Sequence, residues 1–283
     1  MAPIPTPRAP VEDDFGRFAP SAALARMIAA TRACGPGWAG SRRAFAMRNV
    51  AQRLAGSGPL DVETFGMRMR LTASDSSCEK RLLYTPQYVD ALERAILVER
   101  LPADGVFVDI GANVGAFSLF VSAQRPRALV VAVEPQAEIC ARLAYHVRVN
   151  APCGVRVVEC AVADREGEAE LFVDPHDRSR ASIRMLAGDA AQERRRVAVT
   201  TLTALCRQER IRRIDALKVD AGGADDLILD VYLDACPPAE RPSLLILDAT
   251  APASAGLASR LAGLGYRLRA QTRANHVFER CEA

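Results

Sequence analysis

The chain has 283 residues, of which 49% are apolar and 25% charged, and its net charge is +3. This length suits one large α/β domain with an extension better than two full domains, and the apolar fraction is sufficient for a sizeable core. The small net charge gives no general reason to expect nucleic-acid binding, and no apolar run approaches the roughly 20 residues that span a bilayer.

The first 60 residues differ from the rest in composition. Residues 1–20 are rich in proline and acidic residues, and we expect a disordered tail there. A helical extension is predicted over 21–59, with one helix at 21–34 and a second from Arg42 to about Ala55. The second helix is basic and amphipathic, so it suits either a membrane surface or a protein surface. Its few aromatic residues favour packing on the rest of the chain or on a neighbouring subunit of a homo-oligomer, without stable membrane insertion.

From residue 60 onwards the pattern is that of a single α/β domain, 60–283. A small β-hairpin is predicted at 62–71 and an amphipathic helix at 86–100. Short apolar strands then alternate with helices, which predicts a Rossmann-like, doubly wound sheet. An antiparallel hairpin is expected at the carboxyl terminus, at 266–269 and 275–279. The predicted core strands are 106–110, 129–133, 155–159, 216–219 and 244–247. The predicted helices are 114–124, 136–150, 202–209, 223–233 and 253–263. The insertion 168–200 contains two further predicted strands and a polar loop, 174–193, that we expect near the site.

The turn that follows the first core strand has the sequence Asp-Ile-Gly-Ala-Asn-Val-Gly at 109–115. Its glycines allow the backbone to approach a ligand and the next helix to begin tightly. A dinucleotide fold holds a pyrophosphate at such a turn, but Asp109 would repel it. A carboxylate suits the cationic amino group of S-adenosylmethionine instead. We therefore predict that the turn binds this cofactor through Asp109, Gly111, Ala112, Asn113 and Gly115.

A second acidic residue, Glu134, ends the next strand, 25 positions after Asp109. The spacing is close to the roughly 20 residues that separate a glycine turn from the acidic residue that binds ribose hydroxyls. Glutamate is a poor helix N-cap, so a ribose contact is the better interpretation. Small residues after the third strand, including Ala161 and Val162, would leave a flat apolar wall for the adenine ring.

The fourth core strand ends with Lys218 and Asp220. Strand alternation places these two side chains on one face, where they form either a structural ion pair or a catalytic pair. As a catalytic residue, Asp220 would orient or deprotonate the methyl acceptor. Tyr84, Glu79 and the loop residue His176 are further candidates for substrate contact. The eight cysteines are scattered without a C-x-x-C pair, and no export signal is evident, so we expect free thiols, no metal site and a cytoplasmic location.

The span from about 60 to 280 resembles the FkbM-type methyltransferases, a class I S-adenosylmethionine-dependent family. The similar segments are 108–117, 134–135, 200–205 with 217–220, and 265–266 with 275–278. The resemblance implies a seven-stranded sheet and methyl transfer to a hydroxyl of a small-molecule or glycan acceptor, such as a sugar or polyketide. Gly222 stands where that family usually has glutamate, and Asp248 where glutamate is frequent.

Three other functions compete with this prediction. An NAD-dependent oxidoreductase is disfavoured by Asp109 and by the failed G-x-G-x-x-G pattern, whose later glycines would fall on Asn113 and Ala116. A non-catalytic cofactor-binding protein stays open because of Gly222. A nucleic-acid methyltransferase is disfavoured by the modest charge and by the sequence Asp-Ala-Gly-Gly at 220–223, where an Asn/Asp-Pro-Pro-Tyr-like tetrad would be expected.

Overall fold

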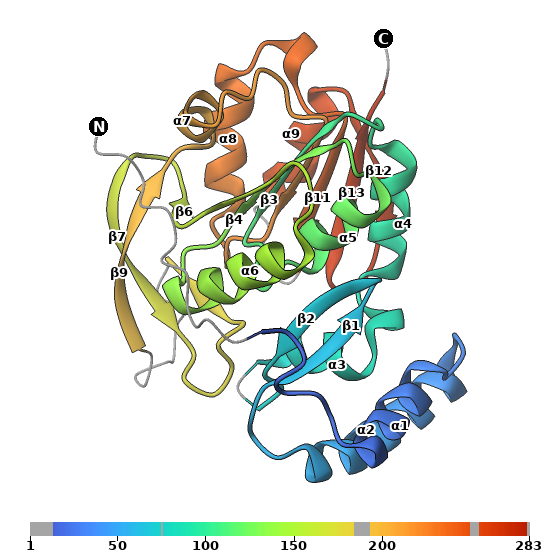
Figure 1. Ribbon diagram of the computed structural model, residues 1–283. Helices are drawn as coiled ribbons and strands as arrows, with labels where there is room; N and C mark the ends of the chain where they lie inside the picture. Colours follow the sequence, from blue (N-terminus) through green and yellow to red (C-terminus); the bar gives the residue numbers. More distant parts are fainter. Residues whose placement is uncertain (1–13, 75, 184–192, 250–254, 282–283) are drawn as a thin grey trace.

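The computed structural model describes residues 14–74, 76–183, 193–249 and 255–281. Its centre is a seven-stranded sheet, in which β13 runs antiparallel to both of its neighbours and the strands from β11 to β5 are parallel (Figure 1). In spatial order the strands are β12 (Tyr266–Gln271), β13 (Asn275–Arg280), β11 (Leu244–Asp248), β10 (Ala216–Val219), β3 (Val106–Ile110), β4 (Leu129–Val133) and β5 (Val155–Val158). The predicted Rossmann-like sheet and its antiparallel carboxyl-terminal hairpin are confirmed.

Helices cover both faces of this sheet, which explains why its strands are apolar on both sides. One layer consists of α4 (Ala91–Arg100), α5 (Ala116–Gln124) and α6 (Ala137–Asn150). The opposite layer consists of α7 (Leu202–Gln208), α8 (Asp225–Ala235) and α9 (Ala255–Gly263). In β3, Val108 and Ile110 pack towards the second layer, while Phe107 packs towards the first. This alternation also decides where the polar residues at the strand ends point.

Two smaller sheets flank the main one. The predicted hairpin is formed by β1 (Leu60–Thr64) and β2 (Met67–Leu71). The insertion folds as a four-stranded sheet in the order β6 (Ala161–Val162), β9 (Glu193–Thr200), β7 (Gly167–Val173) and β8 (Ala181–Ser182). Both strands predicted within the insertion are present. Residues 184–192, part of the predicted polar loop, lie outside the described residues.

The amino-terminal part differs from the prediction at several points. Helices α1 (Ala22–Arg32) and α2 (Trp38–Ala55) form the expected extension, but α2 begins four residues before Arg42. Residues 14–20, expected to be disordered, are held by hydrogen bonds: the backbone N–H groups of Gly16 and Phe18 donate to Asp61. Residues 1–13 lie outside the described residues. Along the described chain, no helix is long and apolar enough to cross a bilayer.

The predicted helix over 86–100 is split. An additional helix, α3 (Ser77–Tyr84), precedes a 3-10 turn, η1 (Pro86–Tyr88), and α4 begins only at Ala91. Proline lacks a backbone N–H, and Asp90 adopts a left-handed conformation with φ of 44°, so α-helical hydrogen bonding begins only after Asp90. The last short element is the 3-10 turn η2 (Pro238–Glu240).

Candidate functional site

A cavity of about 440 Å³ lies at the carboxyl ends of β3, β4, β10 and β11. Ligands bind at this edge of open α/β sheets, and the volume falls within the range of roughly 300–1,000 Å³ that small-molecule sites occupy. The described part of the insertion loop and the first half of α3 complete the wall, so the prediction that this loop lies near the site is confirmed.

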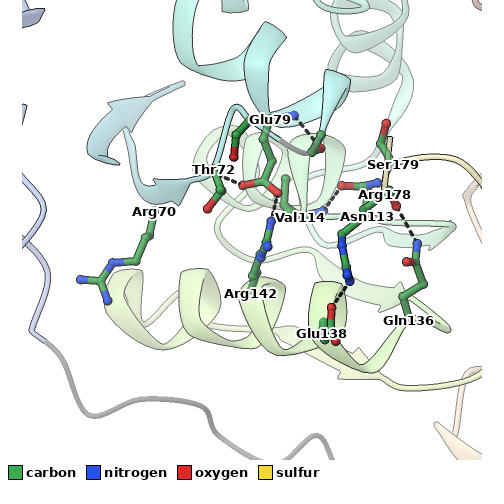
Figure 2. Close-up of polar contacts among 12 residues, drawn as sticks. Arg70, Thr72, Glu79, Asn113, Val114, Gln136, Glu138, Arg142, Arg178 and Ser179 are labelled. Carbon is green, nitrogen blue, oxygen red and sulfur yellow. Dashed lines mark hydrogen bonds and ion pairs between the residues drawn. The ribbon is translucent and has the colours of Figure 1, made fainter. Parts of the chain in front are cut away.

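The glycine turn forms one side of the cavity. Gly111 has φ of +72°, and a Cβ at this position would lie 2.0 Å from the backbone oxygen of Asp220, so only glycine fits. The Asn113 side chain accepts a hydrogen bond from the Val114 N–H at 2.8 Å (Figure 2). Gly111 and Asn113 line the cavity, whereas the other predicted turn residues, Ala112 and Gly115, do not.

Glu134 lies in the cavity wall at the end of β4 and is 4% exposed. Its carboxylate accepts backbone N–H groups from Asn113 at 3.0 Å and from Gln136 at 2.9 Å. Burial raises the pKa of Glu134 to about 7, although these two hydrogen bonds act in the opposite direction. The carboxylate is therefore fixed beside the glycine turn, where it can accept hydrogen bonds from a ligand's hydroxyl groups.

Asp109, predicted as a cofactor contact, does not line the cavity. Strand alternation in β3 directs its side chain, like that of Phe107, towards the α5 layer, and Asp109 is only 1% exposed. There its Oδ2 accepts a hydrogen bond from the Ser118 hydroxyl at 2.6 Å, and its Oδ1 lies 3.7 Å from Lys218 Nζ. Burial raises the pKa of this carboxyl.

Lys218 and Asp220 line the cavity together, as their spacing predicted. Lys218 Nζ lies 3.3 Å from Asp220 Oδ2, but the two side chains differ in exposure: Lys218 is buried, while the Asp220 side chain is 48% exposed. Burial opposes the charge on Lys218, but the carboxylates of Asp220 and Asp109 outweigh it and hold the pKa of Lys218 above its ordinary value. Lys218 is thus a fixed cation beneath a carboxylate that faces the cavity.

Ala161 and Val162, predicted to form an apolar wall, line the cavity. The three residues predicted to contact the substrate do not line it. Tyr84 is fully buried in the core, and His176 lies exposed outside the cavity lining. Glu79 has no exposed surface: it accepts the Thr72 N–H at 2.6 Å and pairs with Arg142, so it joins α3 to α6 (Figure 2).

Charged cavity residues that sequence reasoning missed include Arg81 of α3 and Asp90 just before α4. They form an ion pair with an N–O distance of 3.6 Å, and burial raises the pKa of Asp90. One sequence signal could have revealed α3: Ser76 and Glu79 have the spacing of a capping box, and the Ser76 hydroxyl accepts the Glu79 N–H at 3.2 Å. Arg81 follows two positions later.

The insertion loop is held against the helices that surround the site. Gln136 Nε2 donates to the Arg178 carbonyl at 2.9 Å, and Arg178 pairs with Glu138 of α6 (Figure 2). Strand β8 lies against the turn after β10, where the Ser182 hydroxyl donates to the Gly222 carbonyl. A Cβ on Gly222 would lie 2.2 Å from the carbonyl oxygen of Ala181, so backbone fills the space that a side chain would need.

The chain is similar to several known proteins in sequence and in structure. "AMB antimetabolite synthetase AmbE" of Pseudomonas aeruginosa is 43% identical over 75 residues, which are 26% of this chain and 4% of that protein. "Methyltransferase sdnD" of Sordaria araneosa is 26% identical over 178 residues, 53% of this chain and 68% of that protein. "31-O-demethyl-FK506 methyltransferase FkbM" of Streptomyces tacrolimicus is 35% identical over 97 residues, 34% of this chain and 36% of that protein. The chain thus spans a small part of AmbE and about a third of FkbM.

Among solved structures, M. jannaschii TYW2 in complex with AdoMet has a TM-score of 0.42 and 12% identity, covering 80% of this chain and 88% of that one. A family model described as "Vibrio cholerae RfbT protein" matches residues 73–235. The match covers more than half of the chain and includes the glycine turn, Glu134 and the Lys218–Asp220 pair. The chain therefore belongs to the family described as Vibrio cholerae RfbT protein.

Proposed function

We propose that this protein is an S-adenosylmethionine-dependent methyltransferase that acts on a hydroxyl group of a glycan or natural product. The observation that carries the proposal is Glu134: a buried carboxylate, fixed by two backbone N–H groups, in the wall of a cavity beside a glycine turn. A diol such as a ribose provides the donors that this carboxylate lacks. Two of the relatives are named as methyltransferases, which agrees with the proposal.

The residues present fit this cofactor along the length of the cavity. Glu134 would hold the ribose, and the small side chains of Ala161 and Val162 would face the adenine. Since Asp109 is turned away, the cationic amino group would meet another carboxylate of the cavity lining, of which Asp90 and Asp220 are two. When bound, S-adenosylmethionine supplies a methyl group on a sulfonium, an electrophile for an oxygen nucleophile.

Asp220 is the residue best placed to act on the acceptor. Its carboxylate is half exposed to the cavity, so it can accept the hydrogen of an acceptor hydroxyl and then take up the proton. Lys218 keeps this carboxylate in position from below and supplies a fixed positive charge. Much of the remaining rate enhancement would come from holding the hydroxyl in line for transfer, which the walls of the cavity provide. The name of the FkbM relative, a 31-O-demethyl-FK506 methyltransferase, supports an oxygen acceptor.

Calorimetry with S-adenosylmethionine, S-adenosylhomocysteine and NAD tests the cofactor assignment. We expect binding of the first two and none of NAD; binding of NAD alone would replace the proposal with the oxidoreductase alternative. Release of S-adenosylhomocysteine in the presence of candidate hydroxyl acceptors, including sugars and polyketides, tests the transfer step.

One observation favours a second candidate, a cofactor-binding protein without transferase activity. The position of the usual family glutamate is occupied by glycine, and the backbone of β8 fills the space beside it. If S-adenosylmethionine binds but no acceptor releases S-adenosylhomocysteine, and Asp220→Asn changes nothing, this second candidate becomes the better description.

A further inference from the structure

The α1–α2 hairpin differs from the rest of the molecule in its charge composition. The segment 21–58 contains six arginines and no aspartate, glutamate or lysine. Since the whole chain has a net charge of +3, the remaining residues sum to −3, and the positive charge is concentrated on this hairpin. Arg42, Arg43 and Arg53 are exposed and form no ion pair with any residue that the structure describes.

Large apolar side chains are exposed on the same helix. Seven large hydrophobic residues are exposed in the described chain, and four of them belong to α2. They are Trp38 at 73%, Phe45 at 41%, Val50 at 50% and Leu54 at 60% exposure. Two of the arginines stack on the aromatic rings: Arg42 lies 4.7 Å from the Trp38 ring centre and Arg48 lies 4.8 Å from that of Phe45. At about 100° per residue, Trp38 and Phe45 lie on one side of the exposed surface of α2 and Val50 and Leu54 on the other, with Arg42 and Arg53 between them.

The packing of α2 explains why this face stays open. Its buried side consists of small residues, Ala44 and Ala51, while a Cβ on Gly40 would collide with the backbone oxygen of Gly35. These small residues allow α2 to pack closely on α1. Met47 and Arg48 are partly buried, and the Phe45 ring lies 6.3 Å from that of Tyr88. Trp38, Val50 and Leu54, in contrast, are half exposed or more. In Figure 1 the hairpin projects from the body of the molecule.

Helix α1, in contrast, is fixed to the catalytic domain. The Thr31 hydroxyl donates to the Tyr84 carbonyl at 2.7 Å, and Arg32 Nε donates to the Leu83 carbonyl at 3.0 Å. Both acceptors belong to α3, whose residues Ser77 and Arg81 line the cavity. A surface that binds α2 would thus be connected to the cavity through α1, which packs on α2, and α3, which lines the cavity.

We propose that α2 binds reversibly to anionic phospholipid headgroups at a membrane surface. Exposed tryptophan, phenylalanine and leucine together with arginines are the composition of helices that lie in the membrane interface, where arginine stems rest on apolar chains and the guanidinium groups contact phosphates. The basic helix predicted from the sequence began at Arg42 and so left out Trp38, which is the first residue of α2 in the structure.

Two other partners fit the charges and side chains less well. In a twofold dimer through this face, the unpaired arginines of one copy would meet those of the other. A nucleic acid would attract the arginines but would leave the aliphatic Val50 and Leu54 without a role. Binding to a membrane surface needs no spanning helix, and it does not depend on the proposed methyltransferase activity.

The test uses the full chain and its single tryptophan, Trp38. Phosphatidylcholine vesicles with and without phosphatidylglycerol are titrated while the fluorescence of Trp38 and co-sedimentation are recorded. We expect a blue shift, quenching by brominated lipid and co-sedimentation only with the anionic vesicles, all weakened by added salt. An unshifted emission with protein left in the supernatant would overturn the proposal.

Substitutions in α2 then distinguish the contribution of the arginines to vesicle binding from that of the apolar side chains. Replacing Arg42, Arg43 and Arg53 together by glutamine should lower the partition coefficient on the order of 100-fold. The matched control replaces three exposed arginines elsewhere, Arg194, Arg196 and Arg207, and should change it by less than about twofold. Val50→Ser with Leu54→Ser should also weaken binding, whereas Leu268→Ser should not.

Two further results would contradict the membrane assignment. A Trp38 shift that depends on protein concentration without vesicles would identify the face as a contact between copies. A Trp38 response to a single-stranded oligonucleotide at physiological salt, without a response to vesicles, would identify a nucleic-acid surface. Because wild-type Trp38 reports on the site directly, the decision does not depend on whether every variant folds.

Discussion

Glu134 is predicted to make cofactor binding depend on pH near neutrality. Burial raises the pKa of this carboxyl to about 7 in the free protein, with Asp220 raising it further and Lys218 lowering it. A ribose diol donates its hydrogen bonds to the ionised form. Binding should therefore hold the carboxylate ionised and release the proton that the free protein carries below neutral pH.

The expected magnitudes follow from that pKa. The ionised fraction of Glu134 rises from about one tenth at pH 6 to about nine tenths at pH 8, so affinity should rise about tenfold over this range. Near pH 6 binding should release close to one proton, and near pH 8 almost none. Glu134→Gln removes the negative charge. It also places an amide NH₂ group, which is a donor, next to one of the two backbone N–H groups that the carboxylate accepts. It should weaken binding by about 10- to 100-fold at pH 8 and abolish the pH dependence.

Calorimetry in buffers of different ionisation enthalpy measures both affinity and proton release. Asp225, whose pKa burial also raises to about 7, titrates in the same range, so the difference between wild type and Glu134→Gln isolates the contribution of Glu134. Glu168→Gln, an exposed carboxylate in β7, is the matched control and should leave both quantities unchanged. Wild-type affinity that is constant from pH 6 to pH 8, or a Glu134→Gln protein that binds normally, would refute this role of the buried carboxylate.

Three further predictions concern other parts of the molecule. Asp220→Asn should lower kcat by about 10²- to 10⁴-fold with little change in cofactor affinity, and unchanged turnover would exclude it as the base. Gly222→Ala should cost about 1–3 kcal/mol more in denaturant unfolding than Gly223→Ala, because both residues have positive φ but only Gly222 lies against the Ala181 carbonyl; equal costs would contradict this. Burial lowers the pKa of His146, so the unfolded chain binds a proton there that the folded protein resists. Stability from His146 is complete above its ordinary pKa and is lost as pH falls below it, so wild-type Tm should decline more steeply on acidification than that of His146→Gln; parallel curves would argue against it.

The main sheet could be predicted from sequence because its signal is local. Each core strand is a short apolar run ended by a polar or glycine residue, and the structure reproduces 106–110, 129–133 and 216–219 without change. Burial on both faces makes such runs continuous, and helices of ordinary length separate them. Glu134 and the Lys218–Asp220 pair line one cavity for the same reason, since carboxyl ends of parallel strands meet at one edge.

The direction of the Asp109 side chain could not be predicted in this way. The end of a strand fixes the position of a residue along the sheet, but the side to which its side chain points depends on alternation relative to the flanking helices. In β3 that alternation directs Asp109 to Ser118 and Lys218 and away from the cavity. The pairing register, with Asp109 opposite Lys218, is a tertiary fact that a motif in one strand does not contain.

The remainder of the cavity lining depends still more on tertiary structure, which the sequence patterns do not contain. Its walls come from α3, from β8 and its loop, and from residues such as Asp248 and Asn275 in separate strands. Each segment is short, and none carries a periodic signal. Glu79 and Tyr84 lie only two and three positions from Arg81, yet the helical turn of α3 directs them into the core and directs Arg81 into the cavity. This part of the cavity lining therefore depends on how separate segments meet, as where β8 lies against Gly222.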